Sequence, residues 1–233
     1  MKLALAFLVF AAAPAYADWS IGGYLGVPHT LSSPLRLQRP PDTDVVFTTV
    51  DYAAQPFRFP LYYGYRAAYF PSRHVGIEAE LIHLKAFSDP AEVVGRGGRV
   101  DGRGVADTAP LGDLVQRLSI SHGLNLVFVN AVVRAPARSS SPDCRVSWLA
   151  RAGVGPTVPH AESTIAGVSQ EHYELGRIAV QGAAGVEVRI AQGARIIAEY
   201  KFTRTSQEVG VAGGTASARF ATHHLVFGAG YRF

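Results

Sequence analysis

The chain ends with the nonapeptide LVFGAGYRF, residues 225–233. Apolar side chains occupy every second position of this stretch, from Leu225 through Phe227 and Tyr231 to Phe233, and the residues between them are Val226, Gly228, Gly230 and Arg232. A period of two is typical of a β-strand with one apolar face. Such a strand could be the edge of a soluble β-sandwich or one strand of a barrel that closes on itself.

The aromatic carboxyl-terminal residue separates these alternatives. A last strand that ends on a residue such as Phe233 resembles the assembly signal of bacterial outer-membrane β-barrels. The resemblance implies that the barrel-assembly machinery binds this strand and that lipid surrounds the protein. In lipid every backbone N–H and C=O needs a partner within the protein, and a sheet provides this only by closing. We therefore favour the barrel.

The N-terminus has the features of an exported protein. A positive start, Met1-Lys2, precedes an apolar run over residues 3–13 and the small-residue pattern AYA at 15–17. This order is typical of a secretory signal peptide, and the run is shorter than the about 20 apolar residues of a membrane helix. We expect residues 1–17 to be a signal peptide and residues 18–233 to form one outer-membrane barrel domain.

Composition excludes other classes of function. The net charge of +4 gives no basis for binding nucleic acid, and the single cysteine, Cys144, cannot form an intrachain disulfide. The sequence contains no G-x-S-x-G, H-E-x-x-H or phosphate-loop motif. We expect a monomer whose partners are outer-membrane lipid and lipopolysaccharide.

Eight segments of the mature chain alternate between apolar and small or polar residues. They cover residues 19–30, 61–70, 75–86, 114–134, 146–158, 178–190, 196–202 and 220–233. The connections are alternately long and short, and the long ones are expected to be loops over residues 31–60, 87–113, 160–174 and 209–219. Bacterial barrels combine an even strand number with short periplasmic turns and longer extracellular loops. The sequence thus predicts an all-β fold, an eight-stranded antiparallel up-and-down transmembrane β-barrel with both termini in the periplasm.

The two faces of each strand predict which side chains meet lipid. Leu126, Val186 and Phe227 are expected on the lipid face, and the opposite parity carries charges. Those charges are Arg66, Glu78, Glu80, Arg151, Glu187, Arg189, Glu199, Lys201 and Arg232. An eight-stranded barrel is narrow enough for its side chains to fill. We expect these charges to pair in a plugged lumen; an ion pathway is the alternative.

Histidines gather near the predicted extracellular ends of the strands. They are His29, His83, His122, His160, His172 and His223. They could form an interfacial girdle, because amphipathic side chains are favoured at headgroup depth. They could also form a site on the outer wall, because histidine binds metals and moves protons near neutral pH. There Lys85 could hold a phosphate group, and His83 and Lys85 would neighbour His122 on the next strand.

Three stretches together resemble a proteobacterial barrel family labelled as lipid A oxidase-like outer-membrane proteins, a group of small OmpA- or OmpW-like barrels. They are PLYYGYR at 60–66, residues 71–89 with His83 and Lys85, and SHGLNL at 121–126; GVGPTVPH at 153–160 is similar too. The resemblance implies oxidation of the proximal glucosamine of lipid A to aminogluconate, with molecular oxygen as the oxidant. It also implies His83, Lys85 and His122 as the catalytic residues.

Two functions follow from this sequence. One is an oxidoreductase that acts on lipid A, with His29, His160 and His223 as further candidates at the rim and a divalent metal as a candidate cofactor. The other is a non-enzymatic structural or adaptive barrel of the OmpA or OmpW type. A lipid A deacylase is disfavoured, because Ser121 and His122 are adjacent and would point to opposite faces of a strand.

Overall fold

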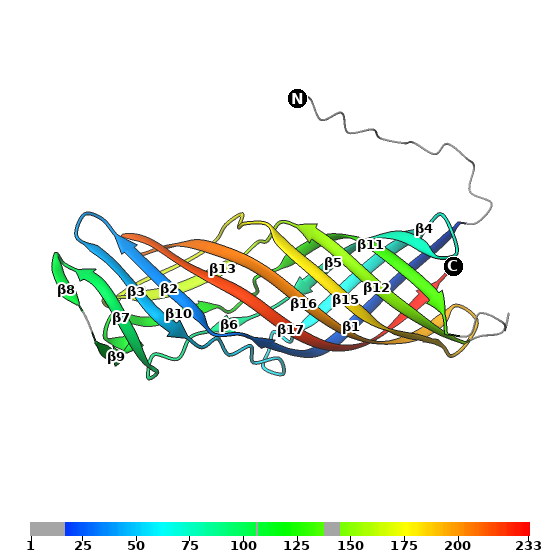
Figure 1. Cartoon of the computed structure of the whole chain (residues 1–233), viewed down its shortest axis with the longest axis horizontal. Helices are drawn as coiled ribbons and strands as arrows, with labels where there is room; N and C mark the ends of the chain where they lie inside the picture. Colours follow the sequence, from blue (N-terminus) through cyan, green and yellow to red (C-terminus); the bar gives the residue numbers. More distant parts are fainter. Residues whose placement is uncertain (1–16, 106, 138–144) are drawn as a thin grey trace, which may run out of the picture.

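A closed barrel of eight antiparallel strands forms one half of the molecule (Figure 1). The computed structural model describes residues 17–105, 107–137 and 145–233, so nearly all of the expected signal peptide lies outside the described residues. In order around the barrel the strands are β1 (Asp18–Thr30), β4 (Tyr63–Phe70), β5 (Val75–His83), β11 (Leu126–Pro136), β12 (Val146–Gly155), β15 (Ala179–Arg189), β16 (Ala194–Val211) and β17 (Gly214–Arg232). The all-β, eight-stranded prediction is confirmed. No helix in the described part of the chain is long and apolar enough to cross a membrane.

The C-terminal strand closes the barrel. Phe227 of β17 lies opposite Leu25 of β1 on one side and Ala198 of β16 on the other. The backbone N–H of Phe233 donates to the carbonyl oxygen of Trp19 at 2.9 Å. The last strand is thus hydrogen-bonded on both edges, and both Asp18 and Phe233 lie at the same end of the barrel. We call this the near end.

Beyond the barrel, at the far end, the chain continues as a β-structured extension. Strands β2 (Ser33–Arg39), β3 (Thr43–Val50), β7 (Val93–Val100), β8 (Arg103–Val105) and β9 (Thr108–Pro110) continue the barrel sheet from β17. A second sheet has the order β14 (Val168–Tyr173), β13 (His160–Ile165), β10 (Val115–Ile120) and β6 (Ala86–Phe87), and η1 (Leu111–Asp113) is a short 3-10 turn.

The extension corrects the expected loops. Residues 31–60, 87–113 and 160–174 contain strands, and in 209–219 only Ala212 and Gly213 separate β16 from β17. In β2 and β3, Leu35, Leu37 and Phe47 are fully buried in an apolar core, so these short strands also have one apolar face. Burial of that face stabilises the hairpins without lipid. Residues 135–145, the short connection expected between the segments 114–134 and 146–158, lie partly outside the described residues.

The outer wall of the barrel exposes a belt of apolar side chains. Its members include Trp19, Ile21, Leu25, Tyr65, Val75, Ile77, Val129, Val133, Trp148, Val154, Val180, Ile196, Leu225 and Phe227. A belt of this kind is what a lipid-facing wall requires.

The expected orientation of β11 is wrong. Leu126 is only 1% exposed, whereas Val129 is 56% exposed and Val127 also faces outward. The segment between β10 and β11 contains two left-handed residues, Gly123 and Asn125, so the alternation upstream of the break does not carry through it. Strand β10 lies in the second sheet, and β11 begins a new register.

Charged pairs fill the lumen, as predicted. Glu80 contacts Lys201, accepts a hydrogen bond from the Tyr24 hydroxyl at 2.7 Å, and lies 3.6 Å from Arg66. Arg151 bridges two further buried carboxylates, those of Glu78 and Glu199. Nearer the termini, Arg232 pairs with Glu187 and with Asp18, and Arg189 is half-buried. Buried ion pairs thus occupy the lumen between the strands.

Candidate functional site

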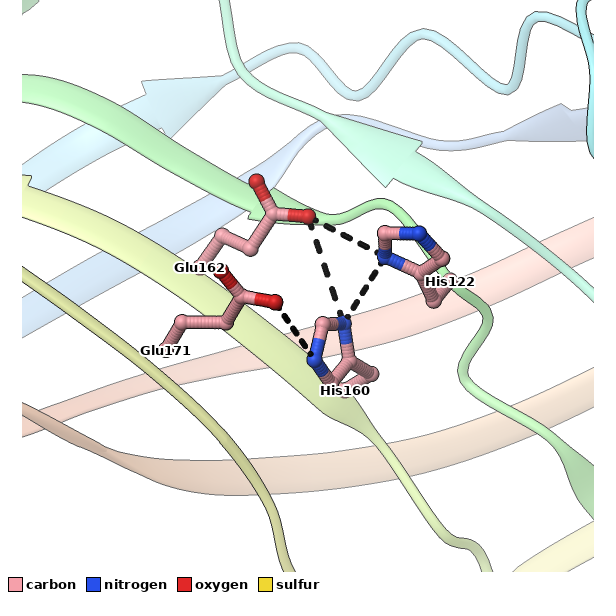
Figure 2. A group of neighbouring side chains, drawn as sticks. All are labelled: His122, His160, Glu162 and Glu171. Carbon is pink, nitrogen blue, oxygen red and sulfur yellow. Dashed lines mark hydrogen bonds and ion pairs between the residues drawn. The ribbon is translucent and has the colours of Figure 1, made fainter.

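Four polar side chains meet where the barrel passes into the extension (Figure 2). His122 belongs to the segment between β10 and β11, His160 and Glu162 lie on β13, and Glu171 lies on β14. One ligand atom from each residue falls within 4.8 Å of the others. We call these four residues the junction cluster.

Backbone hydrogen bonds fix the two segments that carry the histidines. The N–H of His160 donates to the carbonyl of Gly123 at 3.1 Å, and the N–H of Val158 donates to the carbonyl of Leu124 at 3.2 Å. On β13 and β14, His160 pairs with Tyr173 and Glu162 with Glu171. Successive side chains of a strand alternate faces, so His160 and Glu162 point the same way.

The loop that carries His122 depends on Gly123 and Asn125. Gly123 has φ +102°, and a Cβ there would collide with Nδ1 of His83. Asn125 has φ +42°; its Nδ2 donates to the carbonyl of Val158 at 3.1 Å, and its Oδ1 accepts from Nδ1 of His83 at 3.0 Å. These contacts hold the chain reversal that brings His122 to His160.

The distances inside the junction cluster define two sides of the His160 ring. On one side, Nδ1 of His160 is 3.1 Å from Nδ1 of His122 and 4.0 Å from Oε1 of Glu162. Nδ1 of His122 is 3.3 Å from the same Oε1. On the opposite side, Nε2 of His160 is 3.1 Å from Oε1 of Glu171.

Burial and charge differ across the cluster. His160 and Glu162 are buried, and His122 and Glu171 are exposed. The His160 ring packs against Tyr173 with 4.1 Å between ring centroids. Oε2 of Glu162 forms an ion pair with Arg117, and Ser121 hydrogen-bonds to its Oε1. A held carboxylate and two imidazoles can bind a cation or transfer protons.

The predicted residues His83 and Lys85 lie beside this cluster and not within it. The His83 ring is buried against Tyr63, with 4.9 Å between ring centroids and 10° between ring planes. Lys85 is 1% exposed, and its Nζ donates to the carbonyl of Arg58 at 2.6 Å. Burial and then the Arg58 guanidinium lower the pKa of Lys85. Lys85 therefore serves the packing of the extension and offers no open cation to a phosphate.

The structure separates the remaining histidines from the junction cluster. His29 of β1 lies opposite His223 of β17, and Nδ1 of His223 is 2.6 Å from the Tyr200 hydroxyl. His172 pairs with Glu174 at 3.6 Å. Of the predicted residues, only His122 and His160 come together in the cluster.

Sequence reasoning missed Glu162 and Glu171. Both lie in 160–174, which was expected to be a loop, whereas the structure forms a hairpin that turns at Ala166 and Gly167 with φ +48° and +81°. Two successive positive φ values are the geometry of a tight hairpin turn. Had the hairpin been recognised, the spacing of His160 and Glu162 would have placed them on one face.

The apolar belt of the barrel extends to the side of the cluster that faces the barrel. Val127 and Val154 are exposed on the two strands that lead into the His122 and His160 segments. Leu175 is 80% exposed just after β14, where the N–H of Glu174 donates to the carbonyl of Pro159. The cluster is thus at the far-end border of the apolar belt, the part of the wall that would face lipid.

A family model agrees with the barrel architecture. The family model described as "Outer membrane protein beta-barrel domain" matches residues 3–233. The outer membrane protein OprG from Pseudomonas aeruginosa is 12% identical, with a TM-score of 0.46 and coverage of 93% of this chain and 96% of that chain. Ail, the attachment invasion locus protein of Yersinia pestis, solved with the heparin analogue sucrose octasulfate, is 12% identical, with a TM-score of 0.39 and coverage of 93% and 99%. No curated protein sequence matches this chain.

Proposed function

Because the chain belongs to the outer membrane protein beta-barrel domain family, and is thus a small outer-membrane β-barrel, we propose that it acts on lipid A in the outer leaflet. The observation that supports this most is the position of the junction cluster at the far-end border of the apolar belt. Lipid A sugars lie at that depth when the acyl chains contact the belt. In this proposal both termini are periplasmic and the extension is extracellular.

The filled lumen favours a substrate that approaches along the wall. Arg66, Glu80, Arg151 and Lys201 are all buried in ion pairs between the strands. A solute would have to displace these paired side chains to pass. Lipid reaches the outer wall by lateral diffusion and meets no such barrier.

The reaction we propose is the oxidation of the proximal glucosamine with a free anomeric hydroxyl. The hydrogen on the anomeric carbon and the hydrogen of its hydroxyl are removed as two protons and two electrons, which leaves a lactone. Molecular oxygen accepts both protons and both electrons and becomes hydrogen peroxide. Water then opens the lactone to the aminogluconate. His122 is exposed, and in this proposal it is the residue of the cluster that meets the sugar. His83 acts through Asn125 as a positioning residue for the His122 loop.

Mass spectrometry of lipid A from aerobically grown cells tests this proposal. Cells with the wild-type protein should contain lipid A that has gained one oxygen atom, and cells without the protein should not. His122→Asn and Glu162→Gln should abolish the change, while His223→Asn, outside the cluster, should keep it.

The alternative is a barrel that only supports the membrane. Lipid A that is identical with and without the wild-type protein would favour this structural role. An epitope inserted at Gly102, in the turn between β7 and β8, should be reached by antibody on intact cells; exposure only after lysis would reverse the proposed orientation.

A further inference from the structure

We propose that His122, His160 and Glu162 bind one divalent transition-metal ion, and that Glu171 orients His160 from the opposite side of its ring. The assignment of the ion stands on the geometry of the junction cluster. Its use on lipid A rests on the function proposed above.

The spacing of three donor atoms supports a shared ion. Nδ1 of His122 and Nδ1 of His160 are 3.1 Å apart, and Oε1 of Glu162 is 3.3 Å and 4.0 Å from them. Ligands that each lie about 2.0–2.2 Å from one zinc-like ion in a tetrahedral arrangement are about 3.3–3.6 Å apart. The three atoms are therefore near the separations that a common ion requires, and small side-chain rotations complete the set.

Glu171 fits an outer role better than that of a ligand. Its Oε1 faces Nε2 of His160, whereas His122 and Glu162 face Nδ1. A carboxylate that accepts a hydrogen bond from Nε2–H leaves Nδ1 unprotonated, with its lone pair directed at the ion. Metal-bound histidines commonly have such a carboxylate behind them.

The two oxygens of Glu162 have different partners. Oε2 pairs with Arg117, which fixes the carboxylate, and Oε1 faces both imidazoles. Oε1 also accepts from the Ser121 hydroxyl, whose oxygen is 3.0 Å from Nδ1 of His122. The charge of a buried carboxylate is thus directed to the point between the two imidazoles.

The donor set indicates the class of metal. Imidazole suits zinc, iron, copper and nickel, whereas magnesium and calcium prefer oxygen ligands alone. Two histidines and one carboxylate with open positions are typical of catalytic sites for divalent iron or zinc. The exposed His122 leaves one side of the ion accessible to water, oxygen and lipid headgroups.

Titration of the purified, metal-free barrel with Co²⁺ tests the inference. We expect one high-affinity Co²⁺ with visible absorption of four- or five-coordinate geometry, displaced by Zn²⁺ and not by Mg²⁺. His122→Ala and Glu162→Gln should each weaken binding at least tenfold. Glu171→Gln should weaken it about 10- to 100-fold while the spectrum keeps its ligand set. His223→Ala is the matched control and should bind as the wild type does.

Heat-modifiable migration in gels keeps the result interpretable, because it reports barrel folding independently of metal. His122 is exposed, so His122→Ala should migrate as a folded barrel even if changes at the buried His160 do not. Equal Co²⁺ affinity and equal spectra for the wild type and folded His122→Ala would overturn the inference. Metal binding without lipid A oxidation would refute only the proposed function, and oxidation without specific metal binding would refute only the metal site.

Discussion

At the scale of single residues, Gly123 sets the geometry of the junction cluster. Its φ of +102° is costly for residues with a side chain, and a Cβ would meet His83. We expect Gly123→Ala to destabilise the loop by about 1–3 kcal/mol and to displace His122. Co²⁺ affinity should fall while the barrel still folds. The matched change Gly104→Ala, where no atom lies within 4 Å, should bind Co²⁺ normally, and equal affinities for the two variants would contradict this account.

Substitutions at the ion pair of Lys201 and Glu80 test how far the buried charges of the lumen stabilise the barrel. Lys201 is fully buried, and its Nζ contacts Glu80 and lies 3.1 Å from Glu199. Lys201→Met should lower the free energy of unfolding by about 3–5 kcal/mol, because it leaves buried carboxylates without their cation. Adding Glu80→Gln should recover part of that loss. Urea unfolding of the two single variants and the double variant in lipid bilayers measures the coupling; strictly additive losses would show that the pair does not act as a unit.

At the scale of elements, the last strand is the clearest test of assembly. Phe233 donates its N–H to Trp19, and its ring lies 5.1 Å from that of Tyr231. Deletion of Phe233 should reduce the heat-modifiable barrel in the outer-membrane fraction, because it removes the residue that we expect the assembly machinery to bind. Unchanged amounts of folded barrel after the deletion would refute the assembly-signal interpretation.

Exposed valines on β11 and β3 test which part of the chain lipid surrounds. Val129 and Val46 are both exposed valines on strands, one on the barrel and one on the extension. Val129→Arg should cost about 1–2 kcal/mol, because a charge on a lipid-facing wall costs about 2–4 kcal/mol at the midplane and less toward the interface, and Val129 lies opposite Val154 near the border of the belt. Val46→Arg should change stability by no more than about 0.5 kcal/mol, because water surrounds the extension. Equal costs, measured by urea unfolding in bilayers, would place both strands in the same medium.

The sequence predicts the strands of the barrel, whose outer face must be apolar against lipid. It does not predict the strands of the extension, which are under no such constraint. In β1 and β17, the need for one apolar face against lipid produces a long alternation that stands out, as at Leu25 and Phe227. Strands β2 and β3 alternate over fewer residues, and proline and charged residues interrupt them, so they were read as a loop. The orientation of β11 was missed because both of its faces are apolar, with Leu126 inward and Val127 outward.

The site was predictable only in part for a related reason. His122 and His160 were identified from their place near strand ends, but their contact depends on long-range pairing of β10 with β13. Glu171 reaches His160 only because the β13–β14 hairpin forms. The family resemblance places Lys85 in the site, but its spacing in the sequence does not show that its Nζ is buried against the Arg58 carbonyl.

At the scale of the whole molecule, a lipid-facing barrel with a filled lumen carries a histidine–carboxylate cluster at the border between its apolar belt and the extension. The arrangement exposes His122 at this border, which we propose lies at the depth of the lipid headgroups. We propose that this cluster oxidises lipid A at the wall of the barrel.

The most direct measurement is the conversion of lipid A with a free anomeric hydroxyl by purified barrel in mixed micelles, under air and under argon. The wild-type protein should yield lipid A with one additional oxygen atom, together with hydrogen peroxide, only under air. Folded His122→Asn should yield neither, and His223→Asn should match the wild type. Unmodified lipid A with the metal-loaded wild-type protein under air, or equal conversion by His122→Asn, would contradict the account.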